Sequence, residues 1–373
     1  MKQRTKFCIG DKSYGARHAL VIAELGTGHG ADRAKAVELV DAAAEAGADC
    51  VKFQMVYADE ILHPNTGEAP LPGGRVPLYD RFKQLEMPVD FFAEMKETVE
   101  KKGLLFLCTP FGARSARDVR ALNPAVLKIA SPELNYTALL REIASYNLPV
   151  FLSSGVSKLS DIEEALTALS NAPVCLLHCV TSYPAPPREY NLRVLRSLSA
   201  VFGVPTGVSD HSMDAALVPS VAAAVGAAAV EKHFCLSRKD PGLDDPIALD
   251  PKDFSAMVKA IRETEAAASS RGTHAALEEI KRERGEDIVE AILGDGVKRL
   301  AFSEEANYTR TNRSIHALCD IREGELIARE MIACLRSEKV LRPGLPPSWE
   351  EKIIGRRARA FIPAGEGVRF EDV

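Results

Sequence analysis

Between residues 19 and 268 the chain alternates short apolar runs with segments of helical pattern. The eight runs, each predicted to form a strand, are Ala19–Glu24, Cys50–Gln54, Leu104–Cys108, Val126–Ala130, Pro149–Ser153, Val174–His178, Pro205–Val208 and Ala228–His233. Continuous apolar strands separated by helices are typical of a parallel sheet that helices cover on both faces. Eight such units in about 250 residues favour a closed (β/α)8 barrel, the TIM barrel, over an open doubly wound sheet.

The loop after the first predicted strand argues against a dinucleotide-binding fold. It reads GTGHG (Gly26–Gly30) and continues with Asp32 and Arg33, so the GxGxxG motif expected at this point is incomplete. Helices are predicted over Arg33–Ala46, Val89–Lys102, Ser157–Ala168, Leu192–Phe202, Met213–Val225 and Lys252–Ala268. The stretch between the second strand and about Met87 is rich in Pro and Gly and is interpreted as a long excursion.

Charge and cysteine usage exclude several classes of function. The chain has 47 Lys and Arg against 52 Asp and Glu, a net charge of −5, and no long basic run, which disfavours nucleic-acid binding. It has no 18-residue apolar run, and its first residues, MKQRTKFCIGDKSYG, lack a hydrophobic leader, so neither a membrane span nor secretion is expected. Its 8 cysteines form no CxxC pair, which favours reduced thiols and a cytoplasmic protein.

The alternation of apolar runs and helical patterns ends at about Ala268. We predict a barrel domain over residues 1–270, a charged linker with a helix over 271–311, and a small β-rich domain over 312–373. The last segment consists of short strand and turn patterns and is too short to be a second enzyme. It is interpreted as a cap or a dimerisation module.

Polar side chains recur at the end of every predicted strand. In a TIM barrel the catalytic residues project from the C-terminal ends of the strands and from the loops that follow. The polar residues at these points include Glu24, His29, Lys52, Gln54, Thr109, Lys128, Ser131, Glu133, Ser153, Ser154, His178, Thr181, Tyr183, Ser209, Asp210, His211, Glu231, Lys232 and His233. Polar residues scattered at random over a surface would not recur at the end of every strand. The sequence therefore predicts an active site at the rim formed by the C-terminal ends of the strands.

Two kinds of subsite are expected there. His211 and His233 follow adjacent strands, and two imidazoles with a carboxylate such as Glu24 suit a divalent transition metal. The alternative is that one histidine is a hydrogen-bonded core residue. Cations and hydroxyls that could hold a phosphate are Lys52, Thr109, Lys128, Ser131, Ser153 and Ser154. The lysines interrupt or close apolar runs, where an unpaired charge would be costly, so solvated surface lysines are the weaker interpretation.

Eight phrases of this sequence run in the order seen in the sialic acid synthase family, which the chain resembles from about Val21 to Phe370. They are AELGTGHG (Ala23–Gly30), VKFQ (Val51–Gln54), TPF (Thr109–Phe111), KIASPE (Lys128–Glu133), LSSG (Leu152–Gly155), HCVTSYP (His178–Pro184), SDH (Ser209–His211) and EKHF (Glu231–Phe234). The stretch NRSIHALCDIREGE (Asn312–Glu325) resembles the start of that family's C-terminal antifreeze-like (SAF) domain.

The resemblance implies a metal-dependent transferase that condenses phosphoenolpyruvate with an N-acetylmannosamine-type sugar. The products would be a nine-carbon 2-keto acid and phosphate. A divalent metal, Mn²⁺ or Mg²⁺, would bind the histidines matched by His211 and His233 and polarise the aldehyde of the open-chain sugar. Glu24 and Glu133 match carboxylates that handle water and developing positive charge, which completes the expected catalytic set.

The resemblance also assigns the substrate contacts. Residues expected to hold phosphoenolpyruvate are Lys52, Thr109, Lys128, Ser131, Ser153, Ser154, Thr181 and Ser209, and those expected to hold the sugar are Gln54, Tyr183, Asp244 and Arg313. The family forms a domain-swapped homodimer in which the antifreeze-like domain of one chain caps the partner's barrel. Arg313 would reach across to the sugar's N-acetyl group, and the alternative is an ordinary surface arginine.

Three departures from the family pattern leave the sugar open. Gly242–Asp245 reads GLDD where the family usually has GPDH, the first loop carries Thr27 and Gly28, and RPGLPP (Arg342–Pro347) is short. These changes lie on the expected sugar side and in the cap. A diacetamido acceptor that yields a legionaminic or pseudaminic type of acid is therefore an alternative.

Two other classes of function compete with this interpretation. A Schiff-base pyruvate aldolase would need an inward-facing lysine, but strand alternation puts Lys232 outside the barrel if Glu231 and His233 face in. A non-catalytic sugar- or ice-binding protein would use the C-terminal domain on an inert barrel. The polar rim argues against that option.

Overall fold

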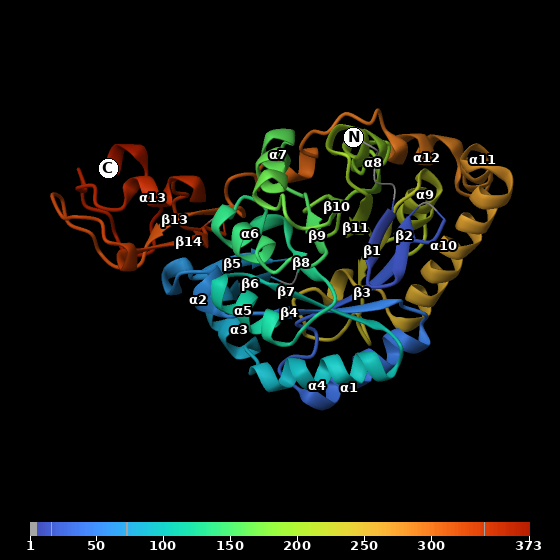
Figure 1. Cartoon of the computed structure of the whole chain (residues 1–373), viewed down its shortest axis with the longest axis horizontal. Coiled ribbons are helices and arrows are strands. Elements are labelled where there is room, and N and C mark those ends of the chain that lie inside the picture. The colour runs from blue at the N-terminus through green and yellow to red at the C-terminus, as the bar shows by residue number, and fades with distance from the viewer. Residues whose placement is uncertain (1–5, 16, 72–73, 339) are drawn as a thin grey trace.

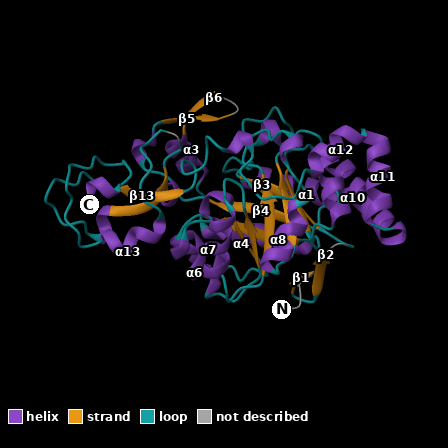
Figure 2. Ribbon diagram, turned by 90° about the horizontal axis from the view of Figure 1, so that it is seen from above, coloured by secondary structure: helices purple, strands orange, loops and turns teal. Residues whose placement is uncertain are grey.

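The computed structural model of the chain describes residues 6–15, 17–71, 74–338 and 340–373. Its centre is a parallel eight-stranded sheet surrounded by helices (Figures 1 and 2). The strands are β3 (Leu20–Gly26), β4 (Cys50–Met55), β7 (Leu105–Pro110), β8 (Leu127–Ile129), β9 (Val150–Ser153), β10 (Val174–Cys179), β11 (Thr206–Asp210) and β12 (Ala229–His233). Their order is β7-β4-β3-β12-β11-β10-β9-β8, and β7 contacts β8, so the barrel is nearly closed. The predicted TIM-barrel fold is confirmed.

A helix follows each barrel strand. These helices are α1 (Arg33–Glu45), α4 (Val89–Lys101), α5 (Ala113–Ala121), α6 (Thr137–Ala144), α7 (Leu159–Ala168), α8 (Val194–Phe202), α9 (Leu217–Val225) and α10 (Pro251–Arg271). The first begins where it does because the Asp32 carboxylate accepts hydrogen bonds from the backbone N–H groups of Ala34 and Lys35. The outward-facing residues of the strands pack against these helices in the main hydrophobic core.

The inward-facing side chains of the barrel form two layers of opposite character. The lower layer is apolar and contains Leu20, Ile22, Cys50, Leu107, Val126, Phe151, Cys175, Leu177 and Ala229. Successive side chains of a strand alternate between its faces, so the next inward position lies two residues further on. These positions are Glu24, Lys52, Thr109, Lys128, Ser153, Cys179 and Glu231. The alternation that fills the core therefore also delivers the polar side chains to the C-terminal end of the barrel.

A hairpin that the sequence did not predict closes the N-terminal end of the barrel. It consists of β1 (Lys6–Ile9) and β2 (Lys12–Gly15), which pair antiparallel. Its Phe7, Ile9 and Tyr14 side chains belong to the lower apolar layer, and the ring centroid of Phe7 lies 4.6 Å from that of Phe151. Solvent is thereby kept from the end opposite the polar residues.

The excursion after β4 is structured and reaches the C-terminal domain. It contains α2 (Ala58–Ile61), an antiparallel hairpin of β5 (Glu68–Leu71) and β6 (Gly74–Pro77), and α3 (Leu78–Leu85). Within it, Asn65 Nδ2 donates a 2.9 Å hydrogen bond to the carbonyl of Ala364. No element had been predicted here, because the Pro and Gly residues of the stretch led it to be interpreted as a loop.

The C-terminal part forms a linker and a second small domain. Two helices, α11 (Thr273–Arg284) and α12 (Glu286–Leu293), lie at the end of the molecule opposite this domain (Figure 1). Its elements are the antiparallel strands β13 (Arg313–Ala317) and β14 (Ile332–Arg336) and the short helix α13 (Glu350–Ile353). It has a core of its own, built on Ile315, Ile321, Ile327, Ile362 and Val368.

Short 3-10 helices occur in the connecting loops. They are η1 (Pro64–Thr66), η2 (Ser131–Glu133), η3 (Pro187–Glu189), η4 (Asp245–Ile247), η5 (Phe302–Glu304), η6 (Arg329–Met331), η7 (Pro347–Trp349) and η8 (Phe370–Asp372). Among the described residues, no helix combines the length and the apolar character needed to cross a bilayer.

Candidate active site

A cavity of about 540 Å³ opens at the C-terminal ends of the barrel strands. Predicted site residues that line it are Glu24, Lys52, Gln54, Lys128, Ser131, Ser153, Thr181, Tyr183, Ser209, His211, His233 and Asp244. Four other predicted residues do not line it: Thr109, Glu133, Ser154 and Arg313. The structure thus brings together most of the side chains that the sequence had placed at one rim.

A buried array of opposite charges forms the bottom of this cavity. Lys52 Nζ lies 3.0 Å from Glu231 Oε1 and 3.4 Å from Glu24 Oε2. Lys128 Nζ lies 3.3 Å from the same Glu231 oxygen, to which Ser209 Oγ donates a 2.9 Å hydrogen bond. Buried charges are tolerated when they are paired and hydrogen-bonded in this way. The two lysine ammonium groups thus converge on Glu231 Oε1 at the bottom of the cavity and are buried from solvent.

Burial and pairing shift the pKa values of this array in different directions. Burial raises the pKa of Glu24 to about 7, although Lys52 opposes the shift. Burial also lowers the pKa of Lys128 to about 8, against the attraction of Glu231. For Glu231 burial acts upward, but Lys128 and Lys52 outweigh it and hold the pKa of this carboxyl well below its usual range. One carboxyl and one amine can therefore exchange protons near neutral pH.

The hydroxyl groups around the array are suited to an anion. The Thr109 and Ser153 hydroxyls are buried and have no hydrogen-bond partner among the described residues. Buried polar groups are nearly always paired, and Ser153 lines the cavity together with the two lysines, so its free hydroxyl indicates a site for an anionic ligand. Gln54 Nε2 instead donates a 2.7 Å hydrogen bond to Glu24 Oε1, which orients that carboxylate.

The loops after β8, β9 and β10 meet closely at Gly155. A Cβ atom at this position would lie 2.0 Å from Thr181 Oγ1 and 3.0 Å from Ser131 Oγ. The Gly155 N–H donates a 3.0 Å hydrogen bond to Ser131 Oγ. The LSSG phrase therefore needs its glycine for close approach of three loops.

His211 and His233 lie side by side as predicted, with ring centroids 5.5 Å apart. His211 Nδ1 lies 2.9 Å from the Val180 carbonyl, so this nitrogen carries the proton and the other keeps its lone pair. Metal-binding histidines commonly show this hydrogen bond. Burial, reinforced by the nearby His211, lowers the pKa of His233 and keeps that ring neutral, as a ligand must be.

The donor set for a metal consists of these two imidazoles. Within residues 6–15, 17–71, 74–338 and 340–373, His, Cys, Asp and Glu side chains form no group of three that could hold an ion by themselves. Glu24, expected beside the histidines, is instead engaged by Gln54 and Lys52. A metal held here would need substrate or water oxygens to complete its coordination.

The upper part of the cavity is formed by loops and by the C-terminal domain. The Tyr183 ring stacks on His211 with centroids 4.3 Å apart, and Asp244 Oδ2 lies 3.8 Å from His233 Nδ1. Burial raises the pKa of Asp244 to about 6. Arg336 and Glu338, from the end of β14, also line the cavity.

The structure places Glu133 and Arg313 differently from the sequence-based prediction. Arg313 Nε donates a 2.9 Å hydrogen bond to Glu133 Oε1, and Arg313 Nη2 donates one of 2.6 Å to the Phe111 carbonyl. Both side chains are fully buried, so neither faces the cavity of its own chain. Arg336 shares Glu133 at 2.7 Å and does line the cavity. The domain-swapped dimer, in which Arg313 would serve the partner, stays a prediction.

Glu231 and Cys179 also line the cavity. The sequence had placed Glu231 at the rim, facing the same way as His233, but gave it no role in the site, and it did not predict Cys179. Cys179 follows His178, whose ring lies outside the wall and forms a 2.6 Å hydrogen bond with the Tyr190 carbonyl. The polar residue predicted at the end of this strand therefore points away, and the thiol points in.

Lys232 lies outside the barrel wall, as the alternation predicted. Its Nζ lies 2.5 Å from Asp210 Oδ2 and donates a 2.6 Å hydrogen bond to the Ser212 carbonyl. An amine held in this way cannot reach the cavity.

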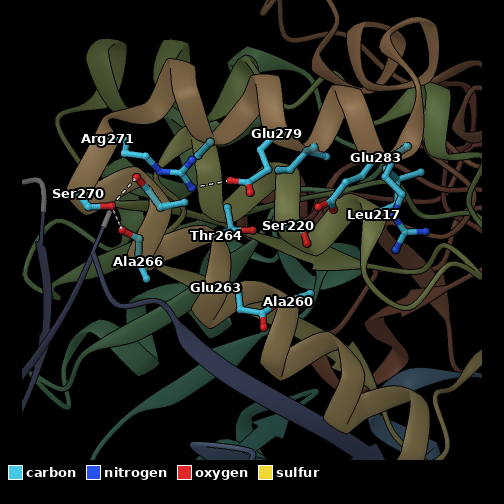
Figure 3. Close-up of a pocket in the computed structure, with 14 residues that line it drawn as sticks. Leu217, Ser220, Ala260, Glu263, Thr264, Ala266, Ser270, Arg271, Glu279 and Glu283 are labelled. Carbon is cyan, nitrogen blue, oxygen red and sulfur yellow. Dashed lines mark hydrogen bonds and ion pairs between the residues drawn. The ribbon is translucent and has the colours of Figure 1, made fainter.

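A second cavity, of about 480 Å³, lies between α9, α10 and α11 (Figure 3). Arg271 pairs with Glu279 at 2.6 Å across it, and Ser270 Oγ donates a 2.8 Å hydrogen bond to the Ala266 carbonyl. It contains none of the predicted site residues. The barrel mouth is therefore the candidate active site.

Fold and site together define a class of TIM-barrel proteins with an anion-binding mouth and an appended β domain. The chain belongs to the NeuB family, whose model matches residues 39–273, and residues 312–373 match the SAF domain. The resemblance seen in the sequence is thereby confirmed.

Three relatives illustrate this membership. The spore coat polysaccharide biosynthesis protein SpsE of Bacillus subtilis is 34% identical over 98% of this chain and 97% of its own, and its crystal structure superposes with a TM-score of 0.81 over 99% of both chains. The N,N'-diacetyllegionaminic acid synthase of Legionella pneumophila is 30% identical over 95% of this chain and 94% of its own. A sialic acid synthetase from Leptospira borgpetersenii, solved with citrate, has a TM-score of 0.63 and 29% identity over 81% of this chain and 94% of that one.

Proposed function

We propose that this protein condenses phosphoenolpyruvate with an N-acetylated hexosamine of the N-acetylmannosamine type, giving a nine-carbon 2-keto acid and phosphate. The coarser class is the sialic, legionaminic or pseudaminic acid synthase type, to which its relatives belong. The observation that carries the proposal is the combination of two buried lysines and the unpaired Ser153 hydroxyl with two adjacent imidazoles in one cavity.

The lower part of the cavity suits phosphoenolpyruvate. Lys52 and Lys128 would neutralise its phosphate and carboxylate, while the Ser153 hydroxyl would donate to one of their oxygens. In the reaction C3 of phosphoenolpyruvate bonds to the sugar's aldehyde carbon as the C=O π bond breaks, the aldehyde oxygen takes up a proton from water and becomes a hydroxyl, and positive charge develops at C2. The negative charge of Glu231 beside both lysines stabilises that cation.

The second step needs a base for water. Water adds at C2, and its proton passes to Glu24, whose pKa of about 7 suits a group that takes up and releases protons near neutrality. The C–O bond to phosphate then breaks as the C2 hydroxyl loses its proton, which leaves the keto group. Gln54 keeps Glu24 oriented throughout.

The upper part of the cavity suits the sugar. A divalent metal, Mn²⁺ or Mg²⁺, bound by His211 and His233 would polarise the aldehyde oxygen. Tyr183 and Asp244 lie beside these histidines and would orient the open-chain sugar. The Schiff-base alternative has no unpaired lysine to use: Lys232 is paired with Asp210 on the far side of the wall, and the inward-facing Lys52 and Lys128 are both paired with Glu231.

A diacetamido sugar is the second candidate acceptor. Asp245, which replaces the histidine of the usual GPDH phrase, is buried and accepts a 2.9 Å hydrogen bond from the Gly242 N–H. Its side chain is therefore committed to the loop rather than offered to a sugar. The N,N'-diacetyllegionaminic acid synthase among the relatives is named for a product with two acetyl groups.

The test is phosphate release with phosphoenolpyruvate, divalent metal and a panel of acceptors. The panel contains N-acetylated mannose and altrose derivatives, mono- and diacetamido, with and without a 6-phosphate, and products are identified by mass. We expect release only when all three components are present. Two results would contradict the proposal. One is that no acceptor of the panel leads to phosphate release, and the other is that borohydride traps pyruvate covalently on a lysine of the protein.

A further inference from the structure

We infer that the segment between the two domains positions the phosphoenolpyruvate half of the active site, with Glu304 as its main positioning residue. This rests on the proposed function. Four side chains, three from the segment and one from the first residue of the SAF domain, are here called the brace and hold the backbone of the loops after β9 and β10. They are Lys298, Glu304, Asn307 and Asn312.

Glu304 is the centre of the brace. Its Oε1 accepts hydrogen bonds from the N–H groups of Val156, at 2.8 Å, and Thr181, at 2.6 Å. Its Oε2 accepts one of 3.1 Å from the N–H of Ala301, and the residue is 1% exposed. A buried carboxylate bonded to two loops from different strands fixes the distance between them.

The other three side chains hold carbonyl groups of the same loops. Asn312 Nδ2 donates a 3.2 Å hydrogen bond to the Val156 carbonyl, and Asn307 Nδ2 donates one of 3.0 Å to the Thr181 carbonyl. Lys298 Nζ donates one of 3.1 Å to the Ser154 carbonyl. Val156 and Thr181 are therefore each held at both the N–H and the C=O group.

Val156 explains why such support is needed. Its φ of 43° lies in the left-handed region, which a β-branched residue avoids because of its crowded Cβ. Such a conformation persists only where the surroundings over-determine it, and it is found mainly at functional sites. Here Glu304 and Asn312 hold the residue from both sides.

The held residues are direct neighbours of the anion site. Val156 follows Gly155, whose N–H bonds Ser131, and both Ser131 and Thr181 line the cavity. Because a Cβ on Gly155 would come within 2.0 Å of Thr181 Oγ1, the two loops have little room to move independently. Releasing Val156 would therefore displace the hydroxyls that are proposed to hold phosphoenolpyruvate, before it affects the sugar contacts of His233 and Asp244.

The experiment compares steady-state kinetics of the full-length protein and three variants. Glu304→Gln keeps the shape but replaces the charge-assisted hydrogen bonds from the Val156 and Thr181 N–H groups by weaker neutral ones, and it turns a donor towards the Ala301 N–H. Asn312→Asp keeps the acceptor for Thr309 while losing the donor to Val156. The matched control is Glu305→Gln, at the exposed neighbouring position. We expect the KM for phosphoenolpyruvate to rise about 10-fold in the first two variants. The KM for the acceptor at saturating phosphoenolpyruvate should change less than about 2-fold.

The outcomes separate this inference from the function on which it rests. If the wild type turns over and neither Glu304→Gln nor Asn312→Asp changes the KM for phosphoenolpyruvate relative to Glu305→Gln, the inference is wrong. Equal rises in both KM values, or a fall in melting temperature with unchanged KM values, would show a merely structural role and also overturn it. A wild type that releases no phosphate with any acceptor would refute the proposed function, and this inference with it. Should one variant not fold, the other carries the comparison.

Discussion

The lower and upper parts of the cavity are built in different ways. The floor, defined as Glu24, Lys52, Lys128, Ser209 and Glu231, sits on barrel strands, and none of these residues is more than 4% exposed. The rim, defined as Tyr183, Asp244, Arg336 and Glu338, sits on loops and on the C-terminal domain, and Tyr183 is 37% exposed.

This difference suggests a division of roles, in which the floor serves the reaction and the rim serves the choice of sugar. Strand positions are fixed by the ladder and by packing on both faces, whereas loops can change length and composition without disturbing the barrel. The GLDD departure (Gly242–Asp245) lies in the loop after β12, on the rim side. A family that keeps one reaction and changes its sugar would vary the rim and retain the floor.

The largest expected effect lies at the junction of the two parts. Replacing His211 or His233 by Ala should reduce turnover at least about 1000-fold, because the aldehyde would lose its Lewis acid. The barrel should remain folded, and calorimetry with Mn²⁺ should show lost binding. His274→Ala, on the exposed face of α11, is the control. Undiminished Mn²⁺ binding would remove both histidines from the metal site.

The next largest effect tests the floor. Lys52→Met removes the cation between Glu24 and Glu231, so kcat/KM for phosphoenolpyruvate should fall about 100-fold. Since a buried carboxylate loses its partner, the free energy of unfolding should fall by about 3 kcal/mol. Denaturant unfolding and kinetics measure the two effects. Lys101→Met, which breaks an exposed pair with Glu97, should change neither.

The pH dependence should come from the floor as well. Lys128, with a pKa of about 8, is charged below pH 8 and neutral above it, so phosphoenolpyruvate should bind less well as the pH rises. Between pH 7 and pH 9 the charged fraction falls about 10-fold, and KM for phosphoenolpyruvate should rise accordingly. In a Lys128→Arg variant the side chain is always charged, so the KM for phosphoenolpyruvate should not rise between pH 7 and pH 9. A profile that is flat from pH 7 to 9 in the wild type would contradict the assignment.

The smallest effect concerns the rim and distinguishes its arginine, Arg336, from the buried Arg313. Arg336→Met should raise the KM for the acceptor about 5-fold and leave the KM for phosphoenolpyruvate within about 2-fold. Arg313→Met should instead lower the melting temperature, because Glu133 and the Phe111 carbonyl lose a buried donor. An acceptor KM that responds to Arg313 and not to Arg336 would favour the domain-swapped arrangement.

Much of the fold and the floor could be predicted from the sequence. The eight barrel strands lie where their apolar runs are, and Lys52, Lys128 and His233 face inward as the strand period requires. The hairpin of Lys6–Ile9 and Lys12–Gly15 was missed because each of its strands has only four residues, too few for a clear pattern.

Local sequence determined which residues form strands and which of their side chains share a face, because those properties depend on neighbours along the chain. Only the tertiary structure decided that Arg336 rather than Arg313 reaches the cavity, that Glu231 joins two lysines, and that Glu304 holds Val156. These contacts join segments more than 100 positions apart. Their geometry follows from how domains and loops pack together, which no short-range pattern encodes.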